Sequence, residues 1–140
     1  MLFQPAQVLE IAGIGKDTLR HWKKFIGPIS GVDGRRHQYT LTELVGICTI
    51  ARAIQDLGLQ ISQFSNYADG LFQDLAPQLP PEGVPQVLCI VPNAMFFANA
   101  SELPDADAIA YIKILPIIQA VFSSLHHGAP LSGPQLELPF

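Results

Sequence analysis

The chain has 140 residues, 49% of them apolar and 14% charged, so the chain as a whole is not a disordered tail and is long enough for one ordinary domain or two small ones. No run approaches the ~18 consecutive apolar residues of a membrane span, and no secretory leader opens the chain, so we expect a soluble cytoplasmic protein without a membrane partner. The net charge of −4, taken alone, argues against binding to nucleic acid. However, residues 1–52 carry seven basic and four acidic residues, whereas residues 53–140 carry one basic and eight acidic residues. This distribution predicts that one side of the molecule is basic.

The first two predicted elements form a helix-turn-helix. Pro5 suits the first turn of a helix that ends at Gly13, because a missing N–H costs nothing there. Residues 13–15 read Gly-Ile-Gly, a tight turn of the kind that joins two short helices at a steep angle. A second helix begins near residue 16, and its inward stripe at three- and four-residue spacing consists of Leu19, Trp22 and Phe25 or Ile26.

The outer face of this second helix is polar and mostly cationic. Its candidate DNA-binding residues are Lys16, Asp17, Thr18, Arg20, His21, Lys23 and Lys24. A helix-turn-helix presents such a face to the major groove of DNA, with its N-terminal end toward the base edges.

A basic arm follows the second helix. Gly27-Pro28 ends the helix, and Asp33-Gly34 is the strongest hairpin signal of the chain. The arm consists of Arg35, Arg36, His37 and Gln38 and ends at Tyr39. Guanidinium groups bind phosphates in bidentate fashion, so a hairpin here places cations beside the recognition helix. Without that helix, the same arm would be interpreted as a solvated surface turn.

Two more helices are expected before the middle of the chain. Thr40 and Glu43 form the capping box of a third helix, which Gly58 closes. Its predicted buried row consists of Leu44, Ile47, Cys48, Ala51 and Ile54. Residues 61–75 are typical of a fourth, more polar helix.

The Pro-rich stretch from Pro77 to Pro85 is the predicted domain boundary. The elements expected after it are a strand at 84–91, a turn at Pro92-Asn93, a strand at 95–98, an element at 108–115 and a helix from 116 to about 125. The element at 108–115 is either a strand or the start of a helix, and its β-branched residues favour a strand.

Three blocks of sequence carry a resemblance to a known family. They read Gly-Ile-Gly-Lys-Asp-Thr-Leu-Arg-His-Trp, then Arg-Arg-His-Gln-Tyr-Thr-Leu-Thr-Glu-Leu, then Asp-Leu-Gly-Leu-Gln-Ile-Ser-Gln-Phe. Residues 3–64 thus resemble the winged-helix DNA-binding domain of the MerR family of transcription regulators. The resemblance implies near-palindromic promoter sites bound by dimers. The DNA contacts that it implies are Thr18, Arg20, His21, Arg35, Arg36 and Tyr39.

The chain departs from the family in two places. The family's wing usually reads Gly-Tyr-Arg-Arg-Tyr, whereas residues 34–39 read Gly-Arg-Arg-His-Gln-Tyr, which leaves open the residue that meets each phosphate. The family usually dimerises through a long helix after the DNA-binding domain, but the prolines between 77 and 85 interrupt such a helix here. We therefore expect any homodimer to form through the C-terminal region.

Taken together, the sequence predicts an α+β protein with a winged-helix domain at residues 1–76, a linker at 77–85, a small α/β dimerisation or partner-binding region at 86–127, and a flexible tail at 128–140. We expect a sequence-specific transcriptional regulator that binds double-stranded DNA as a homodimer. Two alternatives stay open. One is an architectural DNA-binding protein of the excisionase or phage-packaging small-subunit type, and the other is a protein-interaction module whose wing binds an acidic protein.

No catalytic or metal site is predicted. The chain has no phosphate loop, nucleophile elbow or His-Glu zinc motif, so we expect a non-enzyme without a cofactor. Cys48 and Cys89 lie in apolar runs, where buried reduced thiols are expected rather than sensors. His126 and His127 have no third ligand near them in the sequence and are expected to face solvent.

Overall fold

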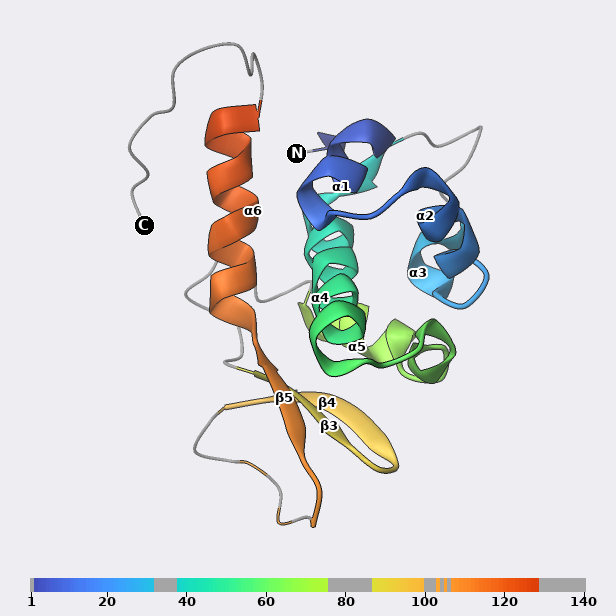
Figure 1. Cartoon of the computed structure of the whole chain (residues 1–140), viewed down its shortest axis with the longest axis vertical. Helices are drawn as coiled ribbons and strands as arrows, with labels where there is room; N and C mark the ends of the chain where they lie inside the picture. Colours follow the sequence, from blue (N-terminus) through green and yellow to red (C-terminus); the bar gives the residue numbers. More distant parts are fainter. Residues whose placement is uncertain are drawn as a thin grey trace.

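The structure, a computed structural model of the chain, describes residues 2–31, 38–75, 87–99, 103, 105 and 107–128. Helix α4 (Leu41–Leu57) runs through the middle of the molecule (Figure 1). Helices α2 and α3 lie to one side of α4, helix α6 lies to the other, and a three-stranded sheet lies at one end. This mixture of helices and small sheets is an α+β fold, as the sequence predicts.

The first two helices lie where the sequence places them. Helix α1 (Pro5–Ala12) begins at its proline and ends at Gly13, whose φ of +71° is a conformation that favours glycine. Helix α2 (Lys16–Trp22) begins after Gly15, which has an extended backbone.

The second helix is shorter than expected. It ends at Trp22, and the Gly27-Pro28 pair that was predicted to end it begins helix α3 (Gly27–Ser30) instead. Proline suits the first turn of a helix because its fixed φ is helical and its missing N–H has no helical partner there. Ile26 and Ile29 are both fully buried, so apolar packing holds this short helix in place.

A short two-stranded ribbon joins the start of the chain to the end of the basic arm. Strand β1 (Leu2–Phe3) pairs antiparallel with strand β2 (Tyr39–Thr40), and Phe3 lies opposite Tyr39. Both of these aromatic side chains are buried. The ribbon was not predicted, because two residues are too few to show a strand period.

Helix α4 has the caps that its sequence predicts. The N–H of Thr40 donates to Oε1 of Glu43 at 2.8 Å, and the N–H of Glu43 donates to Oγ1 of Thr40 at 3.1 Å. Gly58 ends the helix with a φ of +72°. Three residues of the predicted row are buried, and Cys48 and Ile54 are half-buried. Other sides of the helix are buried as well. The buried residues of the helix are Leu44, Val45, Gly46, Ile47, Thr49, Ile50, Ala51 and Ala53.

The predicted fourth helix is two shorter pieces. A 3₁₀ helix, η1 (Ile61–Phe64), is followed by helix α5 (Ala68–Leu75). Ser65 lies between them, and its hydroxyl donates to the carbonyl oxygen of Ser62 at 3.1 Å, a local bond that competes with continuing the helix.

The C-terminal half contributes the sheet and the last helix. Strands β3 (Val87–Val91), β4 (Ala94–Ala98) and β5 (Ala110–Lys113) form an antiparallel sheet in the order β4-β3-β5, which confirms both the predicted hairpin and the preference for a strand within 108–115. Helix α6 (Ile114–Gly128) starts two residues before Pro116, which therefore falls in its first turn, where the ring is tolerated.

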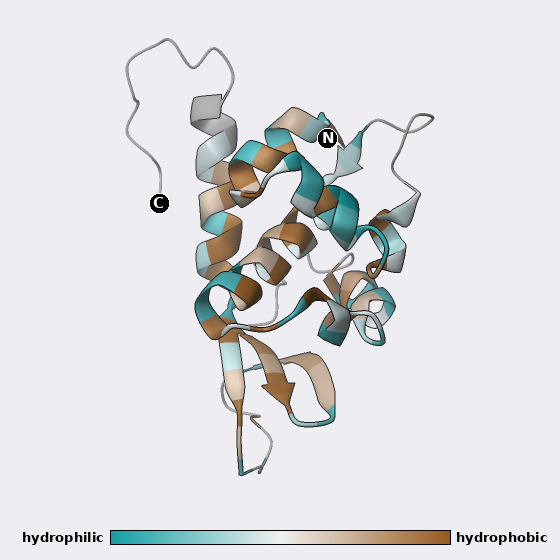
Figure 2. Cartoon of the chain, turned by 45° about the vertical axis from the view of Figure 1, so that its right-hand side comes forward, coloured by the Kyte–Doolittle hydropathy of each residue, from teal (hydrophilic) through white to brown (hydrophobic). Residues whose placement is uncertain are grey.

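Described residues on both sides of the Pro-rich stretch share one hydrophobic core. Leu88, Ile112 and Ile118 belong to the same buried cluster as Leu44 and Phe64. Figure 2 shows apolar residues along α4 and on the strands, and mainly hydrophilic residues on α2. The described part of the predicted region 86–127 thus packs on α4 and shares its core with the N-terminal half, while the linker at 77–85 and most of the tail lie outside the described residues. Within the described ranges, no helix is long and apolar enough to cross a membrane.

Candidate nucleic-acid interface

Helix α2 is held by two buried side chains and exposes the others. Leu19 and Trp22 are 4% and 5% exposed. All seven candidate residues predicted at 16–24 lie outside this buried stripe, and six of them are exposed while Lys23 is partly buried. We call this set the α2 row; its members are Lys16, Asp17, Thr18, Arg20, His21, Lys23 and Lys24.

Backbone geometry fixes the direction in which the α2 row faces. The N–H groups of Gly13 and Ile14 both donate to the carbonyl oxygen of Leu9, at 2.9 and 3.1 Å, so the chain turns tightly after α1. The N–H of Leu19 then donates to the carbonyl oxygen of Gly15 at 3.1 Å, which sets the first turn of α2. The positive φ of Gly13 would be strained for any other residue. The turn at Gly13 therefore depends on glycine, and this turn sets the direction of α2.

Arg20 lies in the middle of the α2 row and makes a weak ion pair. Its Nη1 is 3.6 Å from Oδ1 of Asp17, and the two side chains are 67% and 94% exposed. Exposed pairs of this kind contribute on the order of 0–1 kcal/mol because water and salt screen them. The guanidinium can therefore exchange Asp17 for a phosphate or a base edge at little cost.

Two ring contacts hold the C-terminal end of the row. The rings of His21 and Phe25 meet edge to face with centroids 5.1 Å apart. The Nζ of Lys23 lies 5.8 Å from the centroid of the Tyr39 ring, within the range of a cation–π contact. These contacts restrict His21 and Lys23, whereas Lys16 and Lys24 are exposed at the two ends of the row.

The predicted basic arm is described only at its end. Arg35, Arg36 and His37 lie outside the described residues, so their predicted roles stay predictions. Tyr39 is fully buried and its strand pairs with that of Phe3, and its predicted contact with DNA stays a prediction. The sequence signal for this burial is the apolar Phe3, whose strand pairs with that of Tyr39 across 36 positions of sequence.

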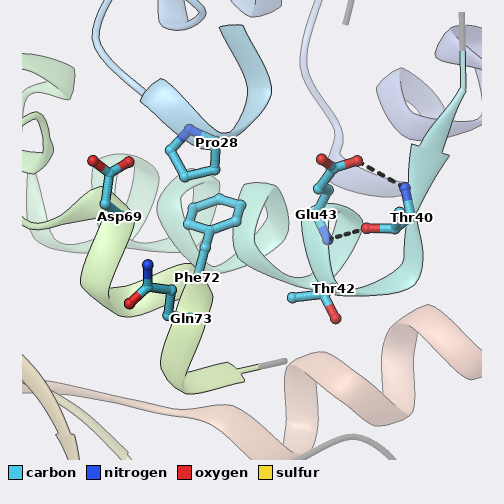
Figure 3. Close-up of a pocket in the computed structure, with 7 residues that line it drawn as sticks. All are labelled: Pro28, Thr40, Thr42, Glu43, Asp69, Phe72 and Gln73. Carbon is cyan, nitrogen blue, oxygen red and sulfur yellow. Dashed lines mark hydrogen bonds between the residues drawn. The ribbon is translucent and has the colours of Figure 1, made fainter. Parts of the chain in front are cut away.

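An open groove of about 540 Å³ lies beside this region, between α3, the start of α4 and α5 (Figure 3). Pro28 and Phe72 form its apolar part, and the carboxylates of Glu43 and Asp69 flank it. Its remaining lining residues are Thr40, Thr42 and Gln73. Because the lining holds two acids and no base, the groove would repel phosphate, and we do not include it in the nucleic-acid interface.

Burial of the two thiols disfavours their ionised forms. Burial raises the pKa of Cys48 to about 12, although the nearby Arg52 acts in the opposite direction. Burial also raises the pKa of Cys89. Both therefore stay protonated at neutral pH, and within the described part of the chain no cluster of three or more His, Cys, Asp or Glu residues is placed to hold a metal ion.

Known proteins add no further constraint. No family model matches the chain, and no curated protein or solved structure matches it either. The resemblance to the MerR family thus depends on the three sequence blocks alone. The α2 row is the surface whose charge and exposure point to a binding partner.

Proposed function

We propose that the protein binds double-stranded DNA through the α2 row, with α2 in the major groove. The observation that carries the proposal is the division of α2 into a buried apolar side and an exposed polar side that holds Lys16 and Arg20, with Lys24 exposed just after the helix. Four of the chain's eight basic residues lie in this row, which contains one acid. Such a surface suits a polyanion better than it suits an apolar partner.

The dimensions of a short helix also suit the groove. The major groove of B-DNA is about 12 Å wide and admits one α-helix, whose N-terminal residues reach the base edges. In α2 the N-terminal residues include Thr18, which is exposed and carries a hydroxyl, and the exposed Arg20 in the last turn carries a bidentate guanidinium donor. Lys23 and Lys24 follow near the C-terminal end, where they would contact the phosphate backbone.

The more specific role that we propose is sequence-specific transcriptional regulation of the MerR type. The sequence resemblance over residues 3–64 supports it, and so does the placement of the basic arm immediately before β2. In this role the arm would bind the backbone beside the recognition helix. An architectural role would use the same surface and differ in the DNA sites that it occupies.

Two arginine variants with the same change in charge test the interface. Arg20→Ala removes a cation from the α2 row, whereas Arg52→Ala removes one from α4, where Arg52 lines a pocket together with residues of α1 and α6. Helix α6 lies on the other side of α4 from α2 (Figure 1). Arg52 is exposed and pairs with Asp56 at 3.3 Å, so its loss is matched to that of Arg20 in exposure and in ion pairing. Binding of each variant to a fluorescent DNA duplex is measured by anisotropy at a series of salt concentrations.

We expect Arg20→Ala to weaken binding and to reduce the slope of log affinity against log salt by about one. Arg52→Ala should change neither. If both variants weaken binding equally, the effect is one of net charge and not of the α2 row. If neither does so at low salt, the DNA-binding proposal is wrong.

Selection from random-sequence DNA then separates regulator from architectural protein. A regulator should enrich a near-palindromic motif and protect a promoter in footprinting. An architectural protein should instead protect attachment or packaging sites. Retention on an acidic protein with no affinity for DNA at low salt would support the interaction-module alternative and contradict our proposal.

A further inference from the structure

Strand β4 is an uncharged strand at one edge of the three-stranded sheet. It reads Ala-Met-Phe-Phe-Ala, and among the described residues it pairs with β3 alone. Proteins usually protect such an edge with charges, prolines or a covering segment, because its free backbone groups can pair with another chain. The opposite edge strand, β5, carries the exposed Lys113, but β4 has no comparable charge.

The register of the β3–β4 hairpin identifies the backbone groups that point away from β3. Val91 and Ala94 lie opposite each other across a two-residue turn, so they are the hydrogen-bonded pair that closes the hairpin. Hydrogen-bonded and non-bonded pairs alternate along an antiparallel ladder. The N–H and C=O groups of Phe96 therefore face β3, and those of Met95 and Phe97 face the edge with which no described strand pairs.

These outward groups are arranged so that β4 can pair with an identical strand. In an antiparallel pair centred on Phe96, Met95 of each copy would lie opposite Phe97 of the other, and the two residues would exchange both backbone hydrogen bonds. Ala94 would lie opposite Ala98, so small residues meet small residues at both ends. This two-fold symmetric register satisfies every outward-facing group of both strands.

Side chains support the same register. Met95 and Phe97 belong to or pack against the core, so they point to the side of the sheet that faces α4 and α5. Phe96 points to the opposite side, is partly exposed, and does not belong to the core cluster. At the centre of the pair, two Phe96 rings would meet at a non-hydrogen-bonded position, where opposing side chains are closest.

We propose that β4 is a homodimerisation strand, which pairs antiparallel with β4 of a second copy about a two-fold axis at Phe96. The two three-stranded sheets then form one continuous sheet in which β4 no longer has a free edge. The partner is a second copy because, in this register, small residues meet small ones, large residues meet large ones, and no like charges meet. The proposal uses no residue of the α2 row and does not depend on DNA binding.

A charge-swap experiment tests the register. Phe96→Asp and Phe96→Lys each place two like charges directly opposite each other in the homodimer, which is unfavourable. An equimolar mixture of the two variants places a carboxylate opposite an ammonium group instead. Association of the wild type, of each variant and of the mixture is measured by sedimentation velocity up to about 100 μM, a range that reaches micromolar dissociation constants.

We expect a wild-type dimer, at least a tenfold rise in the dissociation constant for each single variant, and recovery of the dimer in the mixture. A control variant, Tyr111→Asp, places a carboxylate on the same side of the sheet but on β5, at a side chain that is 50% exposed, and should leave the dimer intact. Circular dichroism shows whether each variant is folded, and recovery in the mixture cannot come from misfolded chains.

Three results would overturn the proposal. A wild-type protein that stays monomeric over the whole range excludes the dimer. Dimers that survive both Phe96 substitutions, or folded variants that do not associate when mixed, place the interface elsewhere. An equal loss of association in Tyr111→Asp would show that the outer side of the sheet, and not the β4 edge, makes the contact.

Discussion

The α2 row and the β4 edge, which pairs with no strand other than β3 among the described residues, differ in almost every physical respect. The α2 row carries four cations, two on α2 and two directly after it, so its outward surface consists largely of charged side chains. The β4 edge carries no charge, and its outward surface consists of fixed backbone donors and acceptors.

This difference determines the kind of partner that each surface fits. Charges act over about a Debye length, roughly 10 Å at 0.1 M salt, so the α2 row suits a polyanion of repeating charge and its binding should weaken as salt rises. Backbone hydrogen bonds require contact and a fixed register, so β4 suits a strand of matching length, and its pairing should depend little on salt. One chain can therefore have two associations that a salt titration separates.

The largest effect is expected from removing the anchor of the α2 row. Trp22→Ala leaves every charge of the row in place but deletes a large side chain that is 5% exposed. We expect a loss of about 3–5 kcal/mol in the free energy of unfolding, measured in urea. Leu115→Ala on α6, where the side chain is 46% exposed, should change it by less than about 0.5 kcal/mol. A small effect of Trp22→Ala would mean that α2 is not held by this contact.

A smaller effect is expected where Phe72 of α5 packs against Gly46 of α4. A Cβ at Gly46 would lie 2.5 Å from the ring of Phe72, whereas a Cβ at Gly70 on α5 would meet nothing within 4 Å. Gly46→Val should thus cost about 1–3 kcal/mol through overpacking. Gly70→Ala should stabilise the protein by roughly 0.5–1 kcal/mol through helix propensity. Thermal unfolding of both variants checks the contrast, and equal effects would contradict the close contact.

The helix ends were predictable because they depend on local chemistry. Pro5, Gly13, Thr40, Glu43 and Gly58 act through their own backbone or through residues three or four positions away, and each marks an observed helix end. The 61–75 region was predicted less well. The spacing of its apolar residues is helical, but the serine and asparagine before Tyr67 favour a turn. Their side chains can bond to nearby backbone groups in place of the helical hydrogen bonds, and the spacing of apolar residues does not reveal this.

Long-range contacts were not predictable in the same way. The burial of Tyr39 depends on Phe3, and the shared core depends on α6 packing against α4 and α1, so residues far apart in sequence decide both. The exposed side of α2 was predictable because Leu19 and Trp22 define the buried side by spacing alone. The β4 edge was not, because strand order places β3 in the middle of the sheet and a hairpin sequence does not contain that information.

The smallest effect is also the one that best separates stability from binding at the α2 row. Asp17→Asn removes the acid of the row and its 3.6 Å pair with Arg20. The unfolding free energy should fall by less than about 1 kcal/mol, because the protein loses a carboxylate placed favourably near the N-terminus of α2 and an exposed ion pair.

The affinity of the same variant for a DNA duplex should rise, because Arg20 no longer has a competing carboxylate and the row repels phosphate less. Anisotropy at low salt measures the gain, which should shrink as salt is added, whereas the dimer measured by sedimentation should not respond to the substitution. Unchanged or weaker DNA binding would contradict the assignment of the α2 row as a phosphate-facing surface, even if the protein stays folded.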